Sequence, residues 1–498
     1  MDAEEAIVLY PSPAIGHLIS MVELGRLILT HRPSLSIHIV LPPAPYQADA
    51  TAPYIAAVSA STPSIAFHRL PPPPATAVFP NSPHHEMLMI ETLRLTLPHL
   101  RRKLQQIVSQ SAAVHALIVD FFNTAALSVA AELEIPCYNF FTSGASCLAF
   151  FLHFPTLHGA HTESFGDLGR TTILEIPGAP KLPASEVPKI LLDRNDDVYR
   201  CFLEFTMRWP EFAGFIVNTF DALESEAVRA ISAGLCVPEL PTSPLYCIGP
   251  LIGDGGARKE GGGAGSDADC LAWLDSQPKQ SVVFLSFGSL GVFSREQLRE
   301  IAIGLERSGQ RFLWVVRDPP SGEDKLGNSD VLLKDPELSL EGLLPDGFLE
   351  RTEGRGHVVK SWAPQVEVLG HESVGGFVTH CGWNSVLEAV RAGVPMVAWP
   401  LYAEQKFNRV LLVEEIRIAL SMVERNDGSG FVEAAEVERR VKELMEIEGP
   451  GELVRRRMVE MKNAAEDALR NDSGSSRVGL VRLVDSLTCQ RVRDSGKP

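Results

Sequence analysis

The sequence predicts an α/β protein built from two doubly wound parallel sheets. With 498 residues the chain is too long for one ordinary core and suits two domains of about 250 residues each. Short apolar strands alternate with helical stretches in both halves, which is typical of doubly wound sheets. A polar Gly-rich run at 253–266 separates the halves. We therefore expect domains at 1–252 and 270–475, a linker at 253–269 and a last helix in 476–498.

The first half opens with a buried strand, Ala6–Tyr10, and a loop that leads into an apolar-periodic helix. His17 lies at the start of this helix, where the helix dipole disfavours the imidazolium ion. The neutral ring that remains suits a general base. A single histidine is more often structural, but this one occupies the first strand-to-helix turn. Further strands of this half are expected at 36–41, 214–219 and 245–248.

Asp120 ends another apolar strand, Ala116–Val119. An aspartate at this place is read equally well as the cap of a following helix at 125–133 or as the carboxylate that orients a catalytic histidine. From the residues alone both readings stay open.

The second half contains the densest set of polar residues, in the segment 362–405. A strand at 376–379 runs into a turn at Gly382 and then into a helix that opens with Asn384 and Ser385. A strand, a glycine turn and a new helix N-terminus together make an anion site. His380 lies in this turn and can donate to the same anion. The other strands of this half are expected at 282–286, 311–316, 357–360 and 395–400.

Other residues of this segment point to a nucleotide. Glu388 lies four positions after Asn384 on one helical face, where its carboxylate can accept from two ribose hydroxyls. Gln365 can assist it, and Trp362 at a strand end can stack on a base. Glu404 follows the strand at 395–400, at the end where α/β sheets bind ligands. The alternative is a well-capped helix among core tryptophans, which we favour for Trp399 but not for the pattern as a whole.

The segment from Trp362 to Gln405 closely resembles the signature of plant secondary-product glycosyltransferases, a UDP-sugar-dependent family with the GT-B fold. The likeness extends over nearly the whole chain. It implies two Rossmann-like domains that face each other across a cleft, with the acceptor bound by the first and the UDP-sugar by the second. The closest group by its motifs is the one that glucosylates flavonoids, isoflavones and chalcones.

The resemblance also implies roles for individual positions. His17 matches the catalytic base and Asp120 its partner. The remaining matches concern the donor: Trp362 and Ala363 for uracil, Gln365 and Glu388 for ribose, His380, Asn384, Ser385 and Ser289 for the diphosphate, and Thr142, Trp383, Glu404 and Gln405 for the sugar. Many relatives carry aspartate where this chain has Glu404. The glutamine at 405 and the tryptophan at 383 favour UDP-glucose.

These matches imply inverting transfer of glucose to a phenolic hydroxyl, which gives a β-glucoside. We expect no cofactor and no metal, with UDP-glucose as the donor substrate. Asp267 and Asp269 have the spacing of a metal-binding pair, but they are more simply read as a helix cap in a Gly-rich run. The regions expected to select the acceptor are 80–91, 147–154 and 183–199. The long polar segment at 318–346 is read as a surface insertion in preference to an acceptor lid.

Composition limits the partners and the location. A formal net charge of −17 argues against nucleic acid and anionic membranes. The sequence has no run of eighteen apolar residues and no basic-then-apolar start, so we expect no membrane segment. Its eight cysteines are scattered without metal-ligand or disulfide spacing. A cytoplasmic monomer is expected.

Four alternatives are considered. Transfer to an aromatic carbon ortho to an ionised phenol would give a C-glucoside, and other small aglycones, such as simple phenols or terpenoids, are further acceptors. A protein that binds a UDP-sugar without transferring it would not need both His17 and Asp120. A dinucleotide oxidoreductase would carry G-x-G-x-x-G after a strand with an acidic residue about twenty positions on, which we do not find.

Overall fold

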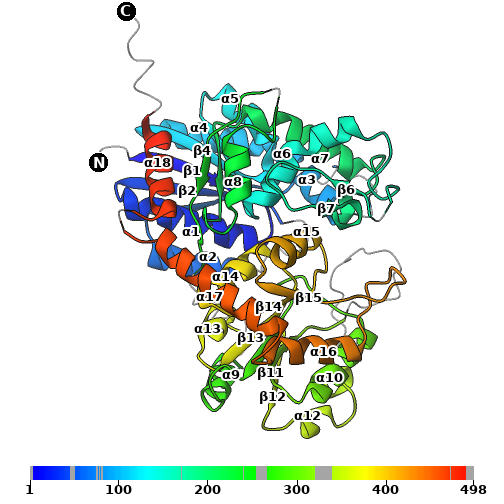
Figure 1. Ribbon diagram of the computed structural model, residues 1–498. Coiled ribbons are helices and arrows are strands. Elements are labelled where there is room, and N and C mark those ends of the chain that lie inside the picture. The colour runs from blue at the N-terminus through cyan, green and yellow to red at the C-terminus, as the bar shows by residue number, and fades with distance from the viewer. Residues whose placement is uncertain are drawn as a thin grey trace, which may run out of the picture. The chain divides into compact units, whose positions relative to one another are not determined.

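The computed structural model describes the chain except for residues 1–3, 45–50, 75–76, 78, 80–81, 83, 170, 239, 254–265, 320–338, 472 and 490–498. Contacts between Cα atoms divide the chain into two compact units (Figure 1). Unit 1 comprises 1–253 and 465–498, and unit 2 comprises 254–464. The chain returns to unit 1 at residue 465, within a helix and earlier than the position 476 expected from the sequence. Most of the Gly-rich run and of the segment 318–346 lies outside the described residues.

Unit 1 is built on a parallel sheet in which seven strands are described, in the order β3-β2-β1-β4-β5-β8-β9. Each strand is short, and apart from the edge strand β3 its residues are mostly buried, as in a sheet covered on both faces. The bounds are β1 Glu5–Tyr10, β2 Leu35–Leu41, β3 Ile65–Arg69, β4 Ala113–Asp120, β5 Cys137–Phe141, β8 Gly214–Val217 and β9 Leu245–Cys247. Two further strands, β6 Ile173–Leu174 and β7 Leu182–Pro183, form a small antiparallel pair.

The strand order of unit 1 reverses between β1 and β4. From β1 the chain moves outward to β2 and β3, and then returns to place β4 on the other side of β1. Such a reversal leaves a crevice at the carboxyl ends of the two central strands, which is where doubly wound sheets bind ligands. The loop after β1 and the end of β4 therefore carry the candidate site of unit 1.

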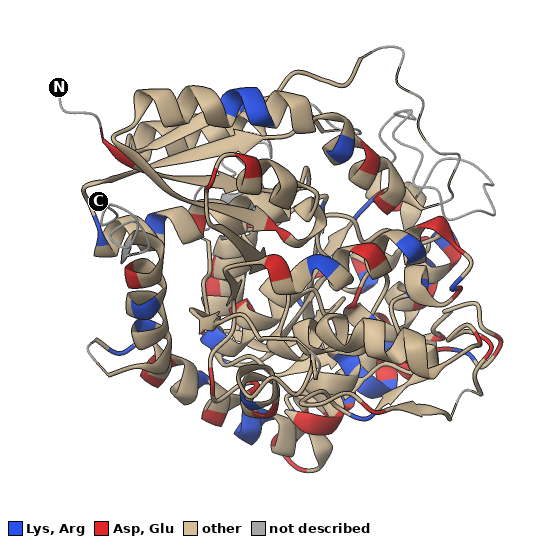
Figure 2. Cartoon of the chain, turned by 90° about the horizontal axis from the view of Figure 1, so that it is seen from above, with Lys and Arg blue, Asp and Glu red and all other residues tan. Residues whose placement is uncertain are grey.

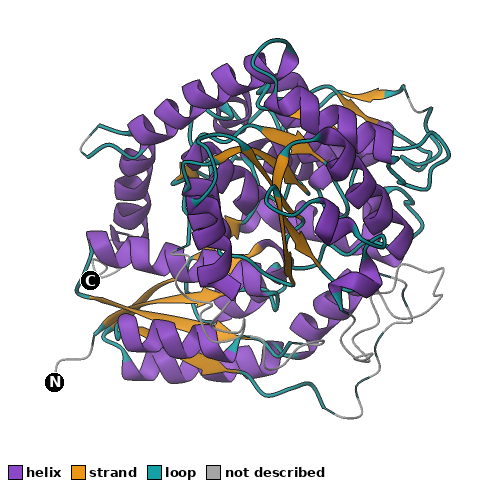
Figure 3. Cartoon of the chain, turned by 90° about the horizontal axis from the view of Figure 1, so that it is seen from below, coloured by secondary structure: helices purple, strands orange, loops and turns teal. Residues whose placement is uncertain are grey.

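Helices cover the strands of unit 1 (Figure 3). Helix α18, Ser475–Cys489, contacts β9, β4 and α1, so this helix packs within unit 1. The other helices are α1 Ile15–His31, α2 Ala52–Ser61, α3 His85–Leu95, α4 Leu97–Gln110, α5 Ala126–Glu132, α6 Ala145–Ala160, α7 Asp197–Arg208 and α8 Ser225–Ser232.

Unit 2 has a second parallel sheet, with six described strands in the order β12-β11-β10-β13-β14-β15. Its order reverses between β10 and β13, which places a second crevice at the carboxyl ends of those strands. The bounds are β10 Val282–Ser286, β11 Arg311–Val316, β12 Gly356–Lys360, β13 Val374–Thr379, β14 Met396–Ala398 and β15 Ala419–Ser421.

The core of unit 2 contains Trp399, which is buried and packs against the rings of Phe287 and Phe293 at 5.5 and 5.2 Å. This confirms the core reading of that tryptophan. The helical elements are α9 Ser266–Asp275, α10 Arg295–Ser308, α11 Leu340–Leu343, α12 Phe348–Arg351, α13 Gln365–Gly370, α14 Trp383–Ala392, α15 Gln405–Val410, the π-helical turn η6 Leu411–Glu415, α16 Ala434–Met445 and α17 Pro450–Ala468.

One local expectation needs correction. Helix α9 begins at Ser266, so Asp267 and Asp269 lie within its first turn and not in a cap that precedes it. Acidic residues favour this position because the N-terminus of a helix carries partial positive charge.

The surface charge is organised locally. In the view of Figure 2, acidic and basic residues follow one another along the helices. On α16, Arg439 pairs with Glu436 and Lys442 with Glu438, three and four residues apart. Of the helices that the structure describes, none is both long enough and apolar enough to cross a membrane.

Candidate active site

The candidate site of unit 1 lies where β1 and β4 end. The chain leaves β1 at Tyr10 and enters α1 at Ile15, which places His17 in the first turn of that helix. Asp120 is the last residue of β4. Their separation in sequence is large, and the reversal of strand order brings them together.

His17 and Asp120 form a direct hydrogen bond, with Nδ1 of the imidazole 2.6 Å from Oδ2 of the carboxylate. A carboxylate only accepts hydrogen bonds, so the ring proton is on Nδ1 and the lone pair is on Nε2. The Asp120 side chain is fully buried, whereas the His17 side chain is 23 % exposed. This geometry suits a general base whose tautomer is fixed by a buried carboxylate.

Two hydroxyl groups that sequence reasoning did not connect with this pair also contact it. Ser12 Oγ donates to Asp120 Oδ1 at 2.8 Å, and Ser12 is itself buried. Thr142 Oγ1 lies 3.3 Å from His17 Nδ1, so the residue matched to sugar binding also borders the base. The signal for Ser12 was a polar residue directly after a buried strand, but its partner is more than one hundred positions away.

Asp120 is also a cap, but not of the helix expected at 125–133, because the N-cap of α5 is Ala125 and makes no side-chain cap hydrogen bond. Its Oδ1 accepts from the backbone N–H of Phe122 and caps the 3-10 turn η1, Phe121–Asn123. Asn123 Nδ2 then donates to the carbonyl of Tyr10 at 2.7 Å, which ties η1 to the end of β1. The same carboxylate therefore holds the loop and orients the histidine.

Aromatic side chains border the His17 ring. The rings of Phe121 and Phe122 lie 6.2 and 6.1 Å from it, and Phe121 continues into contacts with Phe141 and Phe202. An aromatic wall beside a general base suits a flat apolar ligand that carries a hydroxyl group.

The candidate site of unit 2 lies at the carboxyl ends of its strands. Three residues other than glycine have positive φ there: Ser361 after β12, Cys381 after β13 and Ala403 after β14, with values of 69°, 67° and 52°. L-residues rarely adopt this conformation, and it persists where the surrounding structure imposes it. Asn408 Nδ2 helps by donating to the carbonyl of Cys381 at 2.9 Å. These turns aim the residues that follow them at one edge of the sheet.

The turn after β13 carries His380. Its ring is buried, and Nδ1 has no hydrogen-bond partner within the described part of the chain. Burial lowers the pKa of His380 to about 4, so the ring is neutral at physiological pH. A buried ring nitrogen without a protein partner is suited to a ligand. The helix that follows, α14, has Gly382 as its N-cap, with no side-chain cap hydrogen bond, and the N-terminus of a helix favours an anion.

Helix α14 brings two of the predicted residues into contact with Gln365. The Gln365 side chain donates from Nε2 to Glu388 Oε2 at 2.7 Å and to Ser385 Oγ at 2.8 Å. Burial raises the pKa of Glu388 to about 7, while the Gln365 donor lowers it and the Glu367 charge raises it. The predicted ribose pair is thus assembled, and its carboxyl group titrates near neutral pH.

Gln405 is buried and holds its own loop. Its Oε1 accepts from the backbone N–H groups of Leu401 and Tyr402 at 2.8 and 2.9 Å. The carbonyl oxygen is therefore engaged within the loop, and any contact with a ligand must use the amide nitrogen. Asn408 Nδ2 lies 3.5 Å from Glu404 Oε1, one turn along α15.

The remaining predicted residues occupy the ends of strands or helices in unit 2. Trp362 is partly exposed after the Ser361 turn, and its neighbour Ala363 is buried. Trp383 is buried in the first turn of α14, with Asn384 partly exposed beside it. Ser289 is exposed in the turn that follows β10.

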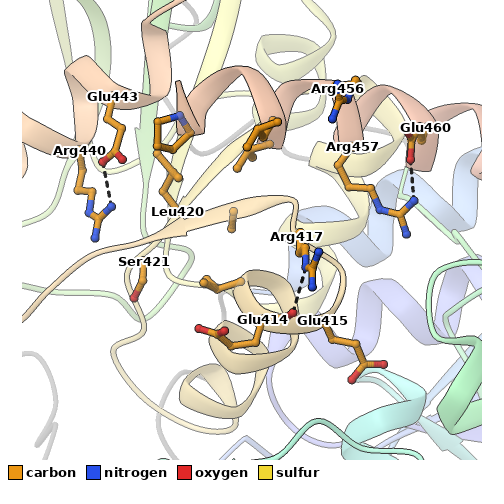
Figure 4. Close-up of a pocket in the computed structure, with 15 residues that line it drawn as sticks. Glu414, Glu415, Arg417, Leu420, Ser421, Arg440, Glu443, Arg456, Arg457 and Glu460 are labelled. Atoms are coloured by element: carbon orange, nitrogen blue, oxygen red, sulfur yellow. Dashed lines mark hydrogen bonds and ion pairs between the residues drawn. The ribbon is translucent and has the colours of Figure 1, made fainter. Parts of the chain in front are cut away.

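A cavity of about 790 Å³ elsewhere in unit 2 is lined by β15, η6, α16 and α17 (Figure 4). Its charged side chains pair with one another: Arg440 Nη1 lies 2.9 Å from a Glu443 oxygen, and Arg457 Nη1 lies 2.7 Å from one of Glu460. None of the predicted site residues lines this cavity. Among the described residues, no group of three or more His, Cys, Asp or Glu side chains is arranged to hold a metal ion.

Two doubly wound parallel sheets, one with a hydrogen-bonded histidine–aspartate pair and the other with a helix N-terminus beside a carboxyl group, fit the class of nucleotide-sugar transferases. Residues 200–420 match the family model of UDP-glucoronosyl and UDP-glucosyl transferase. The chain is 49 % identical over 491 residues to the anthocyanidin 5,3-O-glucosyltransferase of a Rosa hybrid cultivar, covering 96 % of this chain and 98 % of that one. It is 48 % identical over 492 residues to a phloretin 2'-O-glucosyltransferase of Malus domestica, covering 97 % and 100 %.

A solved structure shows the same architecture. Phytolacca americana UGT2 complexed with UDP-2fluoro-glucose and pterostilbene superposes with a TM-score of 0.82 at 36 % identity, over 97 % of this chain and 99 % of that one. The chain belongs to the UDP-glucoronosyl and UDP-glucosyl transferase family, has the GT-B fold and is a UDP-glucose-dependent glycosyltransferase. The family, fold and enzyme class predicted from the sequence are thereby confirmed.

Proposed function

We propose that the protein transfers glucose from UDP-glucose to a hydroxyl group of a small plant phenolic, namely a flavonoid, isoflavone or (dihydro)chalcone. The observation that carries this proposal is the 2.6 Å bond between His17 and Asp120, at the switch point of unit 1 and beside the aromatic rings of Phe121 and Phe122. The relatives named for anthocyanidin and phloretin support this class of acceptor.

In the proposed reaction, Nε2 of His17 takes the proton of the acceptor hydroxyl. The acceptor oxygen forms a bond to the anomeric carbon as the bond from that carbon to the diphosphate breaks, so the α-configured donor gives a β-glucoside and UDP. The imidazolium formed on His17 is stabilised by the Asp120 carboxylate. General base catalysis of this kind contributes roughly 10²–10⁴-fold. A phenol, with a pKa of about 10, matches a histidine base better than an alkyl alcohol does.

The donor is proposed to bind unit 2. Trp362 and the backbone of Ala363 hold the uracil, and Glu388 with Gln365 holds the ribose. The diphosphate accepts hydrogen bonds from the N-terminus of α14, from His380 and from the side chains of Asn384, Ser385 and Ser289. Trp383, Glu404, Gln405 and Thr142 contact the glucose.

Helix N–H groups and a neutral histidine offset the charge of the leaving diphosphate through preorganised donors. We therefore propose catalysis without a metal ion or other cofactor. We also propose a monomer in the cytoplasm that binds neither nucleic acid nor membrane, which the net charge of −17 supports. Light scattering of the purified protein tests whether it is a monomer, because the measured mass would reveal a dimer directly.

The test of function is product formation. The purified protein is incubated with UDP-glucose and each of a panel of flavonoids, isoflavones, dihydrochalcones and simple phenols, and the products are analysed by mass spectrometry. A product heavier by one hexose supports the proposal, and fragmentation distinguishes an O-glucoside from a C-glucoside. Measurable UDP binding without product from any acceptor would favour a UDP-sugar-binding protein.

A further inference from the structure

The His380 ring lies between two glycines that come from different turns of unit 2. An ideal Cβ on Gly288, in the turn after β10, would lie 2.5 Å from Nε2 of the ring. An ideal Cβ on Gly382, at the start of α14, would lie 2.4 Å from the same atom. Real Cβ atoms essentially never approach a heavy atom this closely. The ring can therefore occupy its place only because neither residue carries a side chain.

A glycine can be required by its backbone conformation or by the space that its missing side chain leaves. The two glycines differ in backbone conformation, so the two reasons can be told apart. Gly288 has φ of +73°, a conformation that already disfavours other residues. Gly382 has φ of −62° and ψ of 135°, which any residue adopts without strain. Backbone conformation therefore does not explain Gly382, whereas the room needed by the imidazole does.

The position of the ring matters because of what surrounds it. The ring is buried and its Nδ1 has no protein partner among the residues described. It also lies next to the uncapped N-terminus of α14. A displaced ring would lose its alignment with those N–H groups, and a hydrogen bond to an anion depends steeply on distance and angle.

We propose that Gly288 and Gly382 are positioning residues for donor binding: together they form a slot that fixes the His380 imidazole for a hydrogen bond to the diphosphate. This inference rests on the proposed function, because it takes UDP-glucose as the donor. A methyl group at either position turns the ring away from the diphosphate. The reacting sugar and the His17 base are not touched by this change, but the leaving diphosphate loses a donor, so KM for UDP-glucose rises and kcat falls.

The test compares Gly382→Ala with a matched control, Gly309→Ala. Gly309 ends α10 with φ of +69° and has no atom within 4 Å of an ideal Cβ. It precedes β11 and so lies at the amino ends of the strands, opposite to His380. We expect Gly382→Ala to raise the Kd for UDP and the KM for UDP-glucose by roughly tenfold to a hundredfold, the value of one hydrogen bond to a charged group. Gly309→Ala loses stability but keeps the wild-type Kd.

A double-mutant cycle shows whether the methyl group acts through the ring. In a His380→Ala background the ring is gone, so adding Gly382→Ala should weaken UDP binding by less than twofold. A full effect of Gly382→Ala in that background, or a wild-type Kd in Gly382→Ala alone, would overturn the proposal.

A crystal structure of ligand-free Gly382→Ala tests the slot without any donor. The proposal requires the His380 ring to leave its wild-type position, and an unmoved ring would refute it even if the protein bound no nucleotide. The wild-type protein could fail to bind UDP while the His380 ring moves in Gly382→Ala. That result would refute UDP-glucose as the donor, but it would confirm that the two glycines fix the position of the ring.

Discussion

Replacing Glu388 by glutamine should stabilise the protein at alkaline pH and weaken its binding of uridine nucleotides. Burial holds the pKa of Glu388 at about 7 in the native state, against 4.5 ordinarily. Between these two values the unfolded chain has released this proton while the native protein retains it, so native stability falls as pH rises through that range. Glutamine has nearly the same shape, can still accept from Gln365 and has no charge to bury.

The size of the effect follows from the two pKa values. At about 1.36 kcal/mol per pKa unit, the difference between 4.5 and about 7 corresponds to about 3 kcal/mol once the pH is above 7. The Glu388 side chain retains some exposed surface, so solvent screening reduces this figure. We expect Glu388→Gln to be more stable than wild type by about 1–3 kcal/mol at pH 8 and by close to nothing at pH 4.

Calorimetry with uridine tests the functional part, because uridine has no phosphate that titrates in this range. If the ionised Glu388 accepts from the ribose hydroxyls, the wild-type Kd should fall roughly tenfold from pH 6 to pH 8, as the carboxyl group loses its proton. Glu388→Gln should bind more weakly and show no such dependence. The same pH dependence in both proteins, or a variant that is less stable than wild type at pH 8, would refute the reasoning.

Three further variants test the site. Asp120→Asn should lower kcat by roughly 10²–10⁴-fold with little change in the UDP Kd, because the ring of His17 loses the carboxylate that fixes its tautomer and stabilises its cation; an unchanged kcat would contradict this role. Ser12→Ala should lower kcat less than Asp120→Asn does and shift the pH profile of kcat, because one Asp120 oxygen loses a donor. The exposed control Ser128→Ala should leave kcat and its pH profile unchanged. Identical pH profiles in Ser12→Ala and wild type would exclude a role for Ser12. Gln405→Ala should lower the free energy of unfolding by about 1–3 kcal/mol in urea denaturation, because two loop N–H groups lose their acceptor; unchanged stability would show that the loop does not depend on this side chain.

The sequence was most informative where chemistry and local pattern coincide. The apolar strands predicted at 282–286 and 311–316 have the bounds that the structure shows, and polar residues, Gln310 and Arg317, flank the second of them on both sides. Asp120 was found because a charged residue ends an apolar strand, and His17 because it lies at the start of the apolar-periodic helix that follows the first strand. Their bond follows from the strand order around β1, which a local pattern does not encode.

Contacts between distant segments account for what the sequence did not reveal. The hydrogen bond from Ser12 to Asp120 joins residues more than one hundred positions apart, and the slot around His380 joins turns after β10 and β13. Gln405 was matched to the sugar, but the engagement of its carbonyl oxygen by its own loop depends on the turn at Ala403. Such features depend on Å-scale distances that only the folded chain defines.

The most direct test of the central claim is hexose transfer by wild type and by His17→Ala, measured with UDP-glucose and phloretin as the acceptor, with and without EDTA. We predict a product heavier by one hexose that is lost in His17→Ala and unaffected by EDTA, while both proteins bind UDP equally. Full activity in His17→Ala would contradict the assignment of the base, and loss of activity with EDTA would contradict catalysis without a metal.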